Sequence, residues 1–333
     1  MKEIGVVILN WNGVKMLREY LPSVVDHTPS SLADVVVADN GSTDDSLSML
    51  RSEFPSVRTI SFSENLGYAE GYNRAISELE HEYKYVVLLN SDVKMADDCI
   101  TPLYRFMESH PDAGAAQPKI LSLCEPDKFE YAGACGGFLD RHGYPYCRGR
   151  IFDTVEDDKG QYNTPIKVFW ASGAALIVRT DLFLRAGGLD KVFFAHMEEI
   201  DLCWRIQLLG KEIWAVPSGK IYHLGGGSLP ASSPKKTYLN FRNNLLMLYK
   251  NLPKHPGKAL LIRRRLLDTL AWVKFVAAGE WENAKAIIKA HNDFRKMRGA
   301  YSSQPKSNLL NVDVNIVFDY YIRARRKYSE LRN

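Results

Sequence analysis

Four short apolar runs separated by helical stretches constrain the fold of this chain more than any other feature. We predict strands at residues 4–9, 34–38, 57–62 and 85–89, and the intervals between them have helical periodicity. Strands that alternate with helices are typical of right-handed βαβ units and of a mostly parallel sheet. The sequence therefore predicts an α/β fold in which the polar residues after each strand lie at one ligand-binding edge of the sheet.

The run 85–89 is followed by Asn90, Ser91 and Asp92, which form the most informative of these polar segments. A carboxylate here could hold a divalent cation, because Mg²⁺ and Mn²⁺ take oxygen ligands from carboxylates and substrate phosphates. The alternative is a turn with an Asx cap. Further along, His223 follows what we predict to be an edge strand, where a lone histidine is commonly a hydrogen-bonded structural residue.

The first two strands also end in polar residues. The loop 10–13, Asn-Trp-Asn-Gly, lacks both G-x-G-x-x-G and G-K-[ST], which disfavours a nicotinamide enzyme or an ATPase. Asp39 ends the second strand before a segment of Asn, Gly, Ser and Thr. The alternative to a ligand site is that these polar residues only end the strand and cap the next helix.

Glycines and carboxylates mark two further segments. Gly67 and Gly71 alternate with polar residues after the third strand, so the backbone could approach a ligand there, unless the segment is only a loop and a helix start. Glu198, Glu199 and Asp201 open a helix predicted at about 199–209. Carboxylates are favourable at a helix amino terminus through the helix dipole alone.

Together these segments resemble an inverting glycosyltransferase of family 2, in its rhamnosyltransferase-like branch. The matching motifs are N-x-G-x-A-x-G-x-N at 65–73, N-x-D at 90–92, W-x-S-G-A at 170–174, G-G-L-D at 187–190, E-E-x-D at 198–201 and His223. They occur in the family's order within the first 250 residues. The resemblance implies a GT-A fold, with a mostly parallel central sheet flanked by helices.

The resemblance also implies roles for individual residues. Asp39 matches the carboxylate that binds the nucleotide base, which favours uracil or thymine, and Asp92 and His223 match the metal ligands. The candidates for the donor pocket are Asp39, Asn10, Glu64, Asn65, Gly67, Asn73, Asn90, Asp92 and Trp170.

Glu199 occupies the position of the family's general base, which is an aspartate in the usual E-D-x-D pattern. An inverting transfer needs a base that takes the proton of the acceptor hydroxyl, while a cation stabilises the leaving diphosphate. The longer side chain at position 199 is a departure from the pattern. Glu198 and Asp201 therefore stay open as alternative bases.

Two parts of the chain carry fewer motifs. Residues 122–165 are rich in Gly and Asp without periodicity, and we interpret them as an irregular region over the mouth of the active site. Strands are predicted at 166–170 and 174–178, and from Tyr238 onward only helices, at 238–252, 258–278, 281–297 and 314–325. The predicted organisation is a catalytic domain at 1–237 and a helical extension at 238–333.

The composition and the charges near the carboxyl terminus indicate where in the cell the protein works. The net charge of +4 gives no reason to expect nucleic acid, and five cysteines without metal-like spacing indicate free thiols in a reducing compartment. No segment has 18 uncharged apolar residues, so we expect a cytoplasmic protein. The basic run at 263–265 is typical of a helix at an anionic membrane, here the inner face of the cell membrane, or of an ordinary packed helix with a charged face.

We therefore predict a glycosyltransferase dependent on Mn²⁺ or Mg²⁺ that moves rhamnose or another deoxysugar in cell-envelope polysaccharide synthesis. The donor would be dTDP- or UDP-linked, and the acceptor a saccharide or a polyprenyl-diphosphate-linked glycan. The alternatives are a UDP-hexose-dependent transferase, nucleotidyl transfer and a catalytically silent sugar-nucleotide or glycan-binding module. The lack of a Gly-rich phosphate loop opposes nucleotidyl transfer, whereas the departure at Glu199 supports the silent module.

Overall fold

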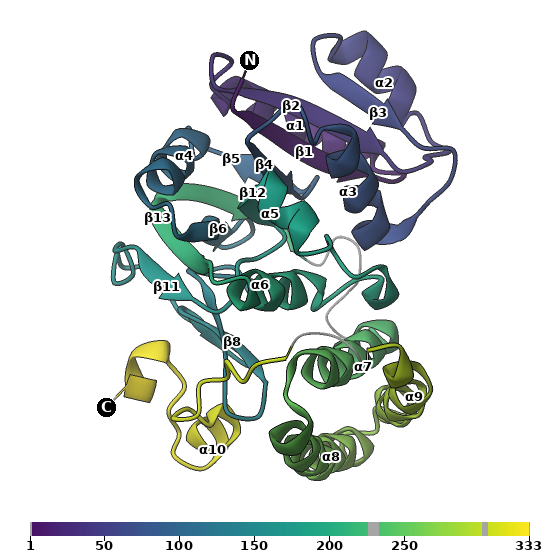
Figure 1. Ribbon diagram of the computed structural model, residues 1–333, viewed down its shortest axis with the longest axis vertical. Coiled ribbons are helices and arrows are strands. Elements are labelled where there is room, and N and C mark those ends of the chain that lie inside the picture. Colours follow the sequence, from purple (N-terminus) through teal and green to yellow (C-terminus); the bar gives the residue numbers. More distant parts are fainter. Residues whose placement is uncertain (1, 226–232, 302–305, 333) are drawn as a thin grey trace.

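A nine-stranded sheet forms the centre of the protein in the computed structural model, which describes residues 2–225, 233–301 and 306–332 (Figure 1). Its strands are β1 (Ile4–Asn10), β2 (Ala33–Asp39), β3 (Arg58–Ser61), β4 (Tyr85–Leu89), β5 (Val93–Met95), β6 (Ala113–Ser122), β11 (Ile166–Val168), β12 (Ala175–Arg179) and β13 (Glu212–His223). They lie in the order β11-β13-β6-β12-β4-β1-β2-β3, and β5 pairs with β13.

Strands β1 to β4 correspond to the four strands predicted first and form a parallel block. β1 pairs in parallel with β2 and β4, and β2 pairs in parallel with β3. Every residue of β4 is buried, as expected for a parallel strand covered on both faces. The parallel register places the carboxyl ends together, with Asn10 opposite Asp39.

Strands from later in the chain complete the edge at which the polar residues lie. β12 runs antiparallel to β4 with Ala175 opposite Leu89. β13 pairs in parallel with β6 and antiparallel with β5, where His223 lies opposite Val93. β13 is thus inside the sheet, between β11 and β6, so the prediction of an edge strand before His223 is wrong.

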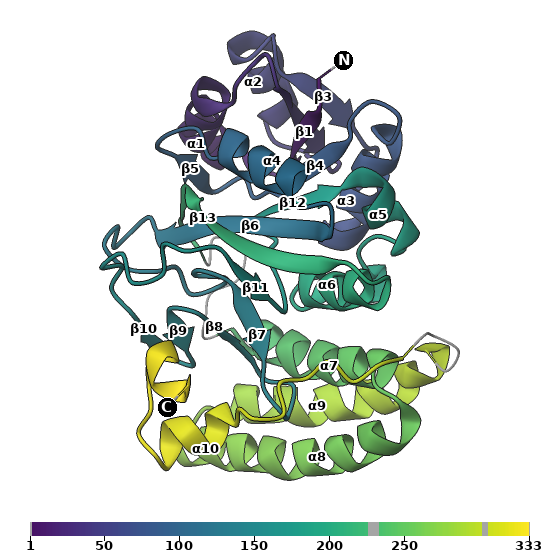
Figure 2. The ribbon, with the colours of Figure 1, turned by 60° about the vertical axis from the view of Figure 1, so that its left-hand side comes forward.

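Helices cover both faces of the sheet (Figures 1 and 2). One face carries α1 (Val14–His27), α2 (Ser46–Glu53) and α4 (Ile100–Ser109), and the other α3 (Gly67–Glu78), α5 (Thr180–Arg185) and α6 (Glu198–Leu208). Successive residues of β1 alternate between two cores, since Val6 packs in the first and Val7 in the second. A 3₁₀ turn, η1 (Lys191–Phe193), precedes α6.

The segment 122–165 is more regular than predicted. It contains β7 (Gly137–Leu139), β8 (Pro145–Cys147), β9 (Arg150–Ile151) and β10 (Thr154–Val155), which form a second sheet in the order β10-β9-β8-β7. Strands of two or three residues are too short for an alternating pattern to be recognised in the sequence. Its position over the mouth of the active site stays a prediction.

The carboxy-terminal helices form a layer on the side of α6 (Figure 2). They are α7 (Pro234–Asn251), α8 (Lys254–Ala277), α9 (Trp281–Met297) and α10 (Ile316–Tyr321), with 3₁₀ turns η2 (Arg298–Tyr301) and η3 (Tyr328–Arg332). The expected domain boundary after residue 237 falls inside α7. α10 is shorter than predicted at both ends, and the side chain of Asn315 caps its start. Among the described residues, no helix is long and apolar enough to span a membrane.

Candidate active site

Asn90, Asp92 and His223 meet at the carboxyl edge of the sheet, as predicted. His223 Nε2 lies 3.1 Å from Asp92 Oδ1 and 3.3 Å from Asn90 Nδ2. The contact depends on the pairing of β13 with β5, because Asp92 directly precedes β5 and His223 ends β13. Asp92 and His223 therefore present a carboxylate oxygen and an imidazole nitrogen to one point.

Glu130, in the segment after β6, lies on the other side of the imidazole. Its Oε1 is 3.6 Å from His223 Nδ1, and its side chain is buried. Burial lowers the pKa of His223, but the carboxylates of Asp92 and Glu130 outweigh burial and raise this pKa to about 10. Glu130 is thus placed to orient the ring, a role the sequence alone did not reveal.

A cation that shares its ligands with a diphosphate would have to displace the proton that His223 holds in the metal-free protein. Within residues 2–225, 233–301 and 306–332, no three His, Cys, Asp or Glu side chains form a group that could hold a metal ion. Asp92 and His223 supply two ligands of types that Mn²⁺ accepts, and a carboxylate behind the histidine is the usual outer partner of a metal-binding imidazole. The phosphates of a nucleotide would have to complete the coordination.

Glu198 and Glu199, at the start of α6, each have one carboxylate oxygen without a partner in the described part of the chain. Oε2 of each is buried and has no hydrogen-bond partner among the described residues. Burial raises the pKa of Glu199 to about 7. Burial, followed by the charge of Glu199, raises the pKa of Glu198 well above its ordinary value. A carboxyl whose pKa is near neutral can accept a proton at physiological pH.

Tyr68, in the first turn of α3, lies between the acidic pair and the histidine. Its hydroxyl is 3.4 Å from Asn90 Oδ1 and donates to the carbonyl of Gly173 at 3.2 Å. Burial raises the pKa of Tyr68, and the charges of Glu198, Glu199 and Asp92 raise it further. The tyrosine is therefore close to both groups of carboxylates.

Gly173 keeps this space open. A Cβ atom on Gly173 would lie 2.7 Å from the Tyr68 hydroxyl and 3.8 Å from Glu199 Cβ. A larger side chain would therefore displace Tyr68. This contact gives a physical reason for glycine in the W-x-S-G-A segment.

The loop before α6 has an unfavourable backbone that α7 holds in place. Phe194, His196 and Met197 have φ angles of 67°, 68° and 73°, in the left-handed region that residues with a side chain seldom adopt. Asn243 Nδ2 lies 2.9, 2.8 and 2.7 Å from the carbonyl oxygens of Phe193, Ala195 and His196. We call this contact the Asn243 clamp. It fixes the loop that leads directly into the acidic pair.

Arg242, the neighbour of Asn243 on α7, belongs to the same support. Its Nη2 donates to the carbonyls of Val192 and Phe193, both at 3.0 Å, and its Nε donates to Asn243. The side chain is buried. Its guanidinium therefore donates hydrogen bonds to the loop before α6.

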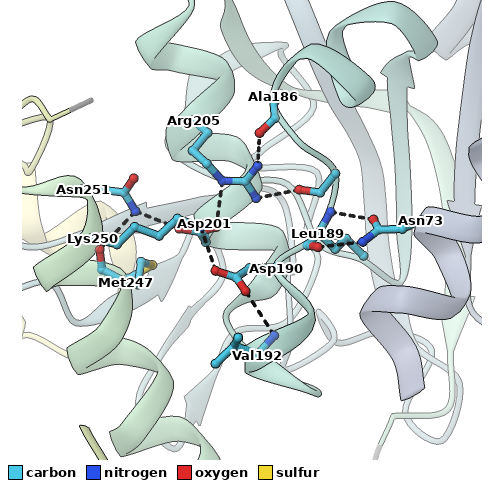
Figure 3. A network of polar contacts seen from close by, with 11 residues as sticks. Asn73, Ala186, Leu189, Asp190, Val192, Asp201, Arg205, Met247, Lys250 and Asn251 are labelled. Atoms are coloured by element: carbon cyan, nitrogen blue, oxygen red, sulfur yellow. Dashed lines mark hydrogen bonds and ion pairs between the residues drawn. The ribbon is translucent and has the colours of Figure 1, made fainter. Parts of the chain in front are cut away.

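Asp201 is not a candidate base. It is fully buried, and its carboxylate accepts hydrogen bonds from Arg205, Lys250 and Asn251, each at 2.8 Å (Figure 3). Burial raises the pKa of Asp201, but the Arg205 and Lys250 cations outweigh burial and lower it. Lys250 also pairs with Asp190 of the G-G-L-D turn at 2.9 Å. These contacts tie α6 to α7.

The polar residues of the first two strands form a second cluster. Asp39 is fully buried and accepts from Asn10 Nδ2 at 2.9 Å and from the Ser42 backbone N–H at 3.0 Å. Asn10 Oδ1 is buried and has no partner among the described residues. Asp39 therefore orients Asn10, and Oδ1 of Asn10 is left without a partner in the described part of the chain.

The other donor-pocket residues predicted from the sequence have surroundings different from those of Asp39 and Asn10. Glu64 and Asn65 are exposed, and the ring of Phe194 lies 3.5 Å from where a Cβ on Gly67 would be. Asn73 exchanges two hydrogen bonds with the backbone of Leu189, both at 2.8 Å (Figure 3). It therefore joins α3 to the G-G-L-D turn.

Trp170 is 3% exposed and donates from Nε1 to the carbonyl of Phe138, while its ring packs against Gly137. Trp170, a predicted donor-pocket residue, thus lies in the interior. The tryptophan links the two sheets.

Comparison with known proteins identifies the family. Residues 5–173 match the family model described as "Glycosyl transferase family 2". The chain belongs to this family. It is similar to N-acetylglucosaminyl-diphospho-decaprenol L-rhamnosyltransferase of Mycobacterium tuberculosis (strain CDC 1551 / Oshkosh), at 30% identity over 239 residues, which cover 66% of this chain and 75% of that protein. It is also similar to rhamnosyltransferase WbbL of Escherichia coli (strain K12), at 25% identity over 167 residues, which cover 47% of this chain and 60% of that protein.

Solved structures support the GT-A fold of this glycosyltransferase. GalNAc-T7, solved with UDP, GalNAc and Mn²⁺, superimposes with a TM-score of 0.60 at 15% identity, covering 93% of this chain and 59% of that one. Mannosyltransferase PcManGT from Pyrobaculum calidifontis, solved with GDP-Man and Mn²⁺, gives 0.53 at 16% identity, covering 90% and 84%. These likenesses confirm the predicted fold.

Proposed function

We propose that this glycosyltransferase transfers rhamnose or another deoxysugar from a dTDP- or UDP-linked donor to a lipid-linked saccharide, with inversion at the anomeric carbon. The observation that carries the proposal is the partnerless pair Glu198 and Glu199, so called because Oε2 of each is buried without a partner among the described residues; the pair lies across Tyr68 and Gly173 from Asp92. The choice of sugar and acceptor follows the printed names of the mycobacterial and E. coli relatives.

Glu199 is the proposed base. With its pKa raised to about 7, it is partly ionised at neutral pH and is a stronger proton acceptor than an ordinary glutamate. As the acceptor oxygen attacks the anomeric carbon, Glu199 takes the hydroxyl proton and the nucleoside diphosphate leaves from the opposite face. Glu198 supports this role, because two adjacent desolvated carboxyls do not readily ionise together.

Asp92 and His223 would hold Mn²⁺ or Mg²⁺, and Glu130 would orient the imidazole. A cation bound there would stabilise negative charge on the leaving diphosphate. The mixed oxygen and nitrogen ligands favour Mn²⁺. GalNAc-T7 and PcManGT, which have the same fold and were solved with Mn²⁺, support this assignment.

Asn10 is the proposed reader of the nucleotide base. Its buried Oδ1 is without a partner among the described residues, and the imide N–H of uracil or thymine would satisfy it. Asp39 would act by fixing the orientation of the Asn10 amide, rather than through direct contact with the base.

A groove of about 650 Å³ between the Phe194 loop, α7 and α9 is the proposed approach of the acceptor. It is lined by Phe194, Tyr238 and Leu239 together with the basic side chains of Lys235, Lys285 and Lys289. Apolar walls with lysines around them suit a lipid that carries a diphosphate. We further propose that the enzyme works at the inner, anionic face of the cell membrane, where such an acceptor would be anchored.

The test is transfer from radiolabelled dTDP-rhamnose, with UDP-hexoses in parallel, in the presence and absence of Mn²⁺. We expect rhamnose transfer, or slow donor hydrolysis without acceptor. Transfer from a UDP-hexose alone would replace the donor assignment. Donor binding with neither transfer nor hydrolysis would identify a silent binding module.

Calorimetric titration of dTDP tests the metal ligands separately. Asp92→Ala and His223→Ala should abolish the gain in dTDP affinity that Mn²⁺ gives to the parent. Glu130→Gln should weaken the metal-dependent gain by about 10- to 100-fold, as expected for an outer partner of a metal ligand. A variant that kept the whole gain would exclude its residue from the metal site.

A further inference from the structure

The chain is divided electrostatically in a way that its overall charge conceals. Residues 254–333 contain 17 Lys and Arg and 7 Asp and Glu, a net charge of +10, whereas the whole chain carries +4. Residues 1–253 therefore carry −6. Such a concentration of positive charge gives one end of the molecule affinity for an anionic surface.

Helix α8 presents an apolar stripe that no other described element covers. Ile262, Leu266, Leu270 and Val273 are 63%, 67%, 64% and 50% exposed, and their spacing of four, four and three residues places them on one face. On the opposite side, Leu260 packs in the core with α7 and α9. The helix is thus apolar both toward the protein and toward solvent.

The exposed charges of α8 are all positive. Lys254, Lys258, Arg263, Arg265 and Lys274 are exposed, while the helix has a single acidic residue, Asp268, which is buried.

Arg264 differs from its neighbours in the basic run. It is buried, pairs with Asp268 at 3.3 Å and stacks on the ring of Tyr144 at 3.7 Å. In the basic run at 263–265, Arg263 and Arg265 are therefore on the surface and Arg264 is part of the interior.

We propose that the outer face of α8 is a membrane-docking surface that lies flat on an anionic bilayer. Its apolar stripe would insert at the boundary between headgroups and acyl chains, and the flanking lysines and arginines would pair with lipid phosphates. Phe318, Tyr321 and Ile322, in and directly after α10, are also exposed.

A second copy of the chain fits this surface less well. In a two-fold dimer the same patch meets itself, so the cations beside the stripe would face one another without a carboxylate on α8 to pair with. An anionic lipid surface satisfies both the apolar and the positive parts. The proposal is independent of the sugar transferred, because vesicle binding needs neither donor nor acceptor.

The experiment is sedimentation of the full chain with vesicles of phosphatidylcholine alone or mixed with phosphatidylglycerol. We expect binding to the anionic vesicles only. The double variant Leu266→Glu/Leu270→Glu should lose it, and Arg263→Gln/Arg265→Gln should weaken it roughly 30-fold, since each cation near the surface contributes about 1 kcal/mol. High salt should weaken binding of the parent as well.

The matched control is Ile288→Glu on α9, which introduces a charge at an apolar side chain of similar exposure, 51%, outside the stripe. It should bind like the parent, and all variants should transfer sugar to a soluble acceptor at the parental rate. Equal binding by the parent and the Leu266→Glu/Leu270→Glu variant, or no binding by the parent, would overturn the proposal. A dimer in sedimentation velocity that the glutamates dissociate would assign the face to a second copy instead.

Discussion

The acidic segment that opens α6 divides into two regions with opposite surroundings. Glu198 and Glu199 face the catalytic edge, where Oε2 of each has no partner among the described residues. Asp201, one turn away, accepts hydrogen bonds from Arg205, Lys250 and Asn251. All three carboxylates are desolvated, yet the pKa of each glutamate is raised and that of Asp201 is lowered.

The difference shows that burial alone does not define a reactive carboxylate. Desolvation raises the pKa of all three residues, and at Asp201 the cations of Arg205 and Lys250, together with the hydrogen bonds from Lys250 and Asn251, reverse its effect. A carboxylate neutralised in this way stabilises the fold. One left without a partner destabilises the fold when it is ionised, but it can accept a proton.

The largest expected effect is the loss of transfer in Glu199→Gln. Glutamine keeps the size of the side chain but cannot take the acceptor proton, so the transfer rate should fall about 10²- to 10⁴-fold while donor affinity persists. Single-turnover transfer and dTDP titration measure the two quantities. Glu198→Gln controls for lost charge at the helix start. If Glu198→Gln were inactive and Glu199→Gln fully active, the base would be Glu198.

Asp201→Asn should affect stability rather than the chemical step. It removes the charge that balances Arg205 and Lys250 in the interior, so we expect a loss of about 3 kcal/mol in the free energy of unfolding. Lys250 keeps Asp190 as a partner, which limits the loss. Denaturant unfolding measures the change. A variant as stable as the parent but without activity would restore Asp201 as a base.

Asn243→Ala tests how the partnerless pair is held in position. Without the Asn243 clamp the strained loop before α6 should shift, and kcat should fall roughly 10- to 100-fold with little change in donor affinity. Its neighbour provides the control, since Asn244 bonds to Gly143 and Arg264, away from the loop. Asn244→Ala should keep the parental pH profile of kcat, whereas Asn243→Ala should move its apparent pKa.

Much of the fold could be predicted because its periodicity is strong. Strands β1 to β4 and helices α7 to α9 have clear apolar patterns, and each was predicted to within a few residues. Strand β6 was missed because Ala113–Ser122 contains Gly, Gln, Pro and Lys, a composition untypical of a central strand. Its Lys119 is buried only because Asp158 pairs with it at 2.7 Å.

The sequence indicates which side chains come together where a motif lies at a strand end, but not where the partners come from distant parts of the chain. Asp92 and His223 meet as expected. Of the partners of Asp201, Arg205 lies one turn away on the same helix, whereas Lys250 lies 49 residues away, on α7. Glu130 and Asn243 were missed because no local pattern indicates what an isolated side chain contacts after folding.

The smallest expected effect is a pH-dependent gain of stability in Glu199→Gln. Because the pKa of Glu199 is raised from 4.5 to about 7, the folded parent holds a proton there that the unfolded chain has released. The parent therefore loses stability as the pH rises from 4.5 to 7, and the loss stays constant at higher pH. Glutamine does not titrate, so the variant should melt at a higher temperature than the parent at pH 8 and at nearly the same temperature at pH 5. A chain of this length shifts its melting temperature by only about 2 °C for each kcal/mol, so thermal scans at several pH values are needed.

An Asp201→Asn variant should show the opposite sign and be less stable than the parent at pH 8. The lowered pKa of Asp201 stabilises the fold at pH values above the pKa that this residue has in the unfolded chain. Equal melting temperatures of Glu199→Gln and the parent at pH 8 would mean that the Glu199 carboxylate has hydrogen-bond partners in solution. The contrast between Glu199 and Asp201 would then be lost.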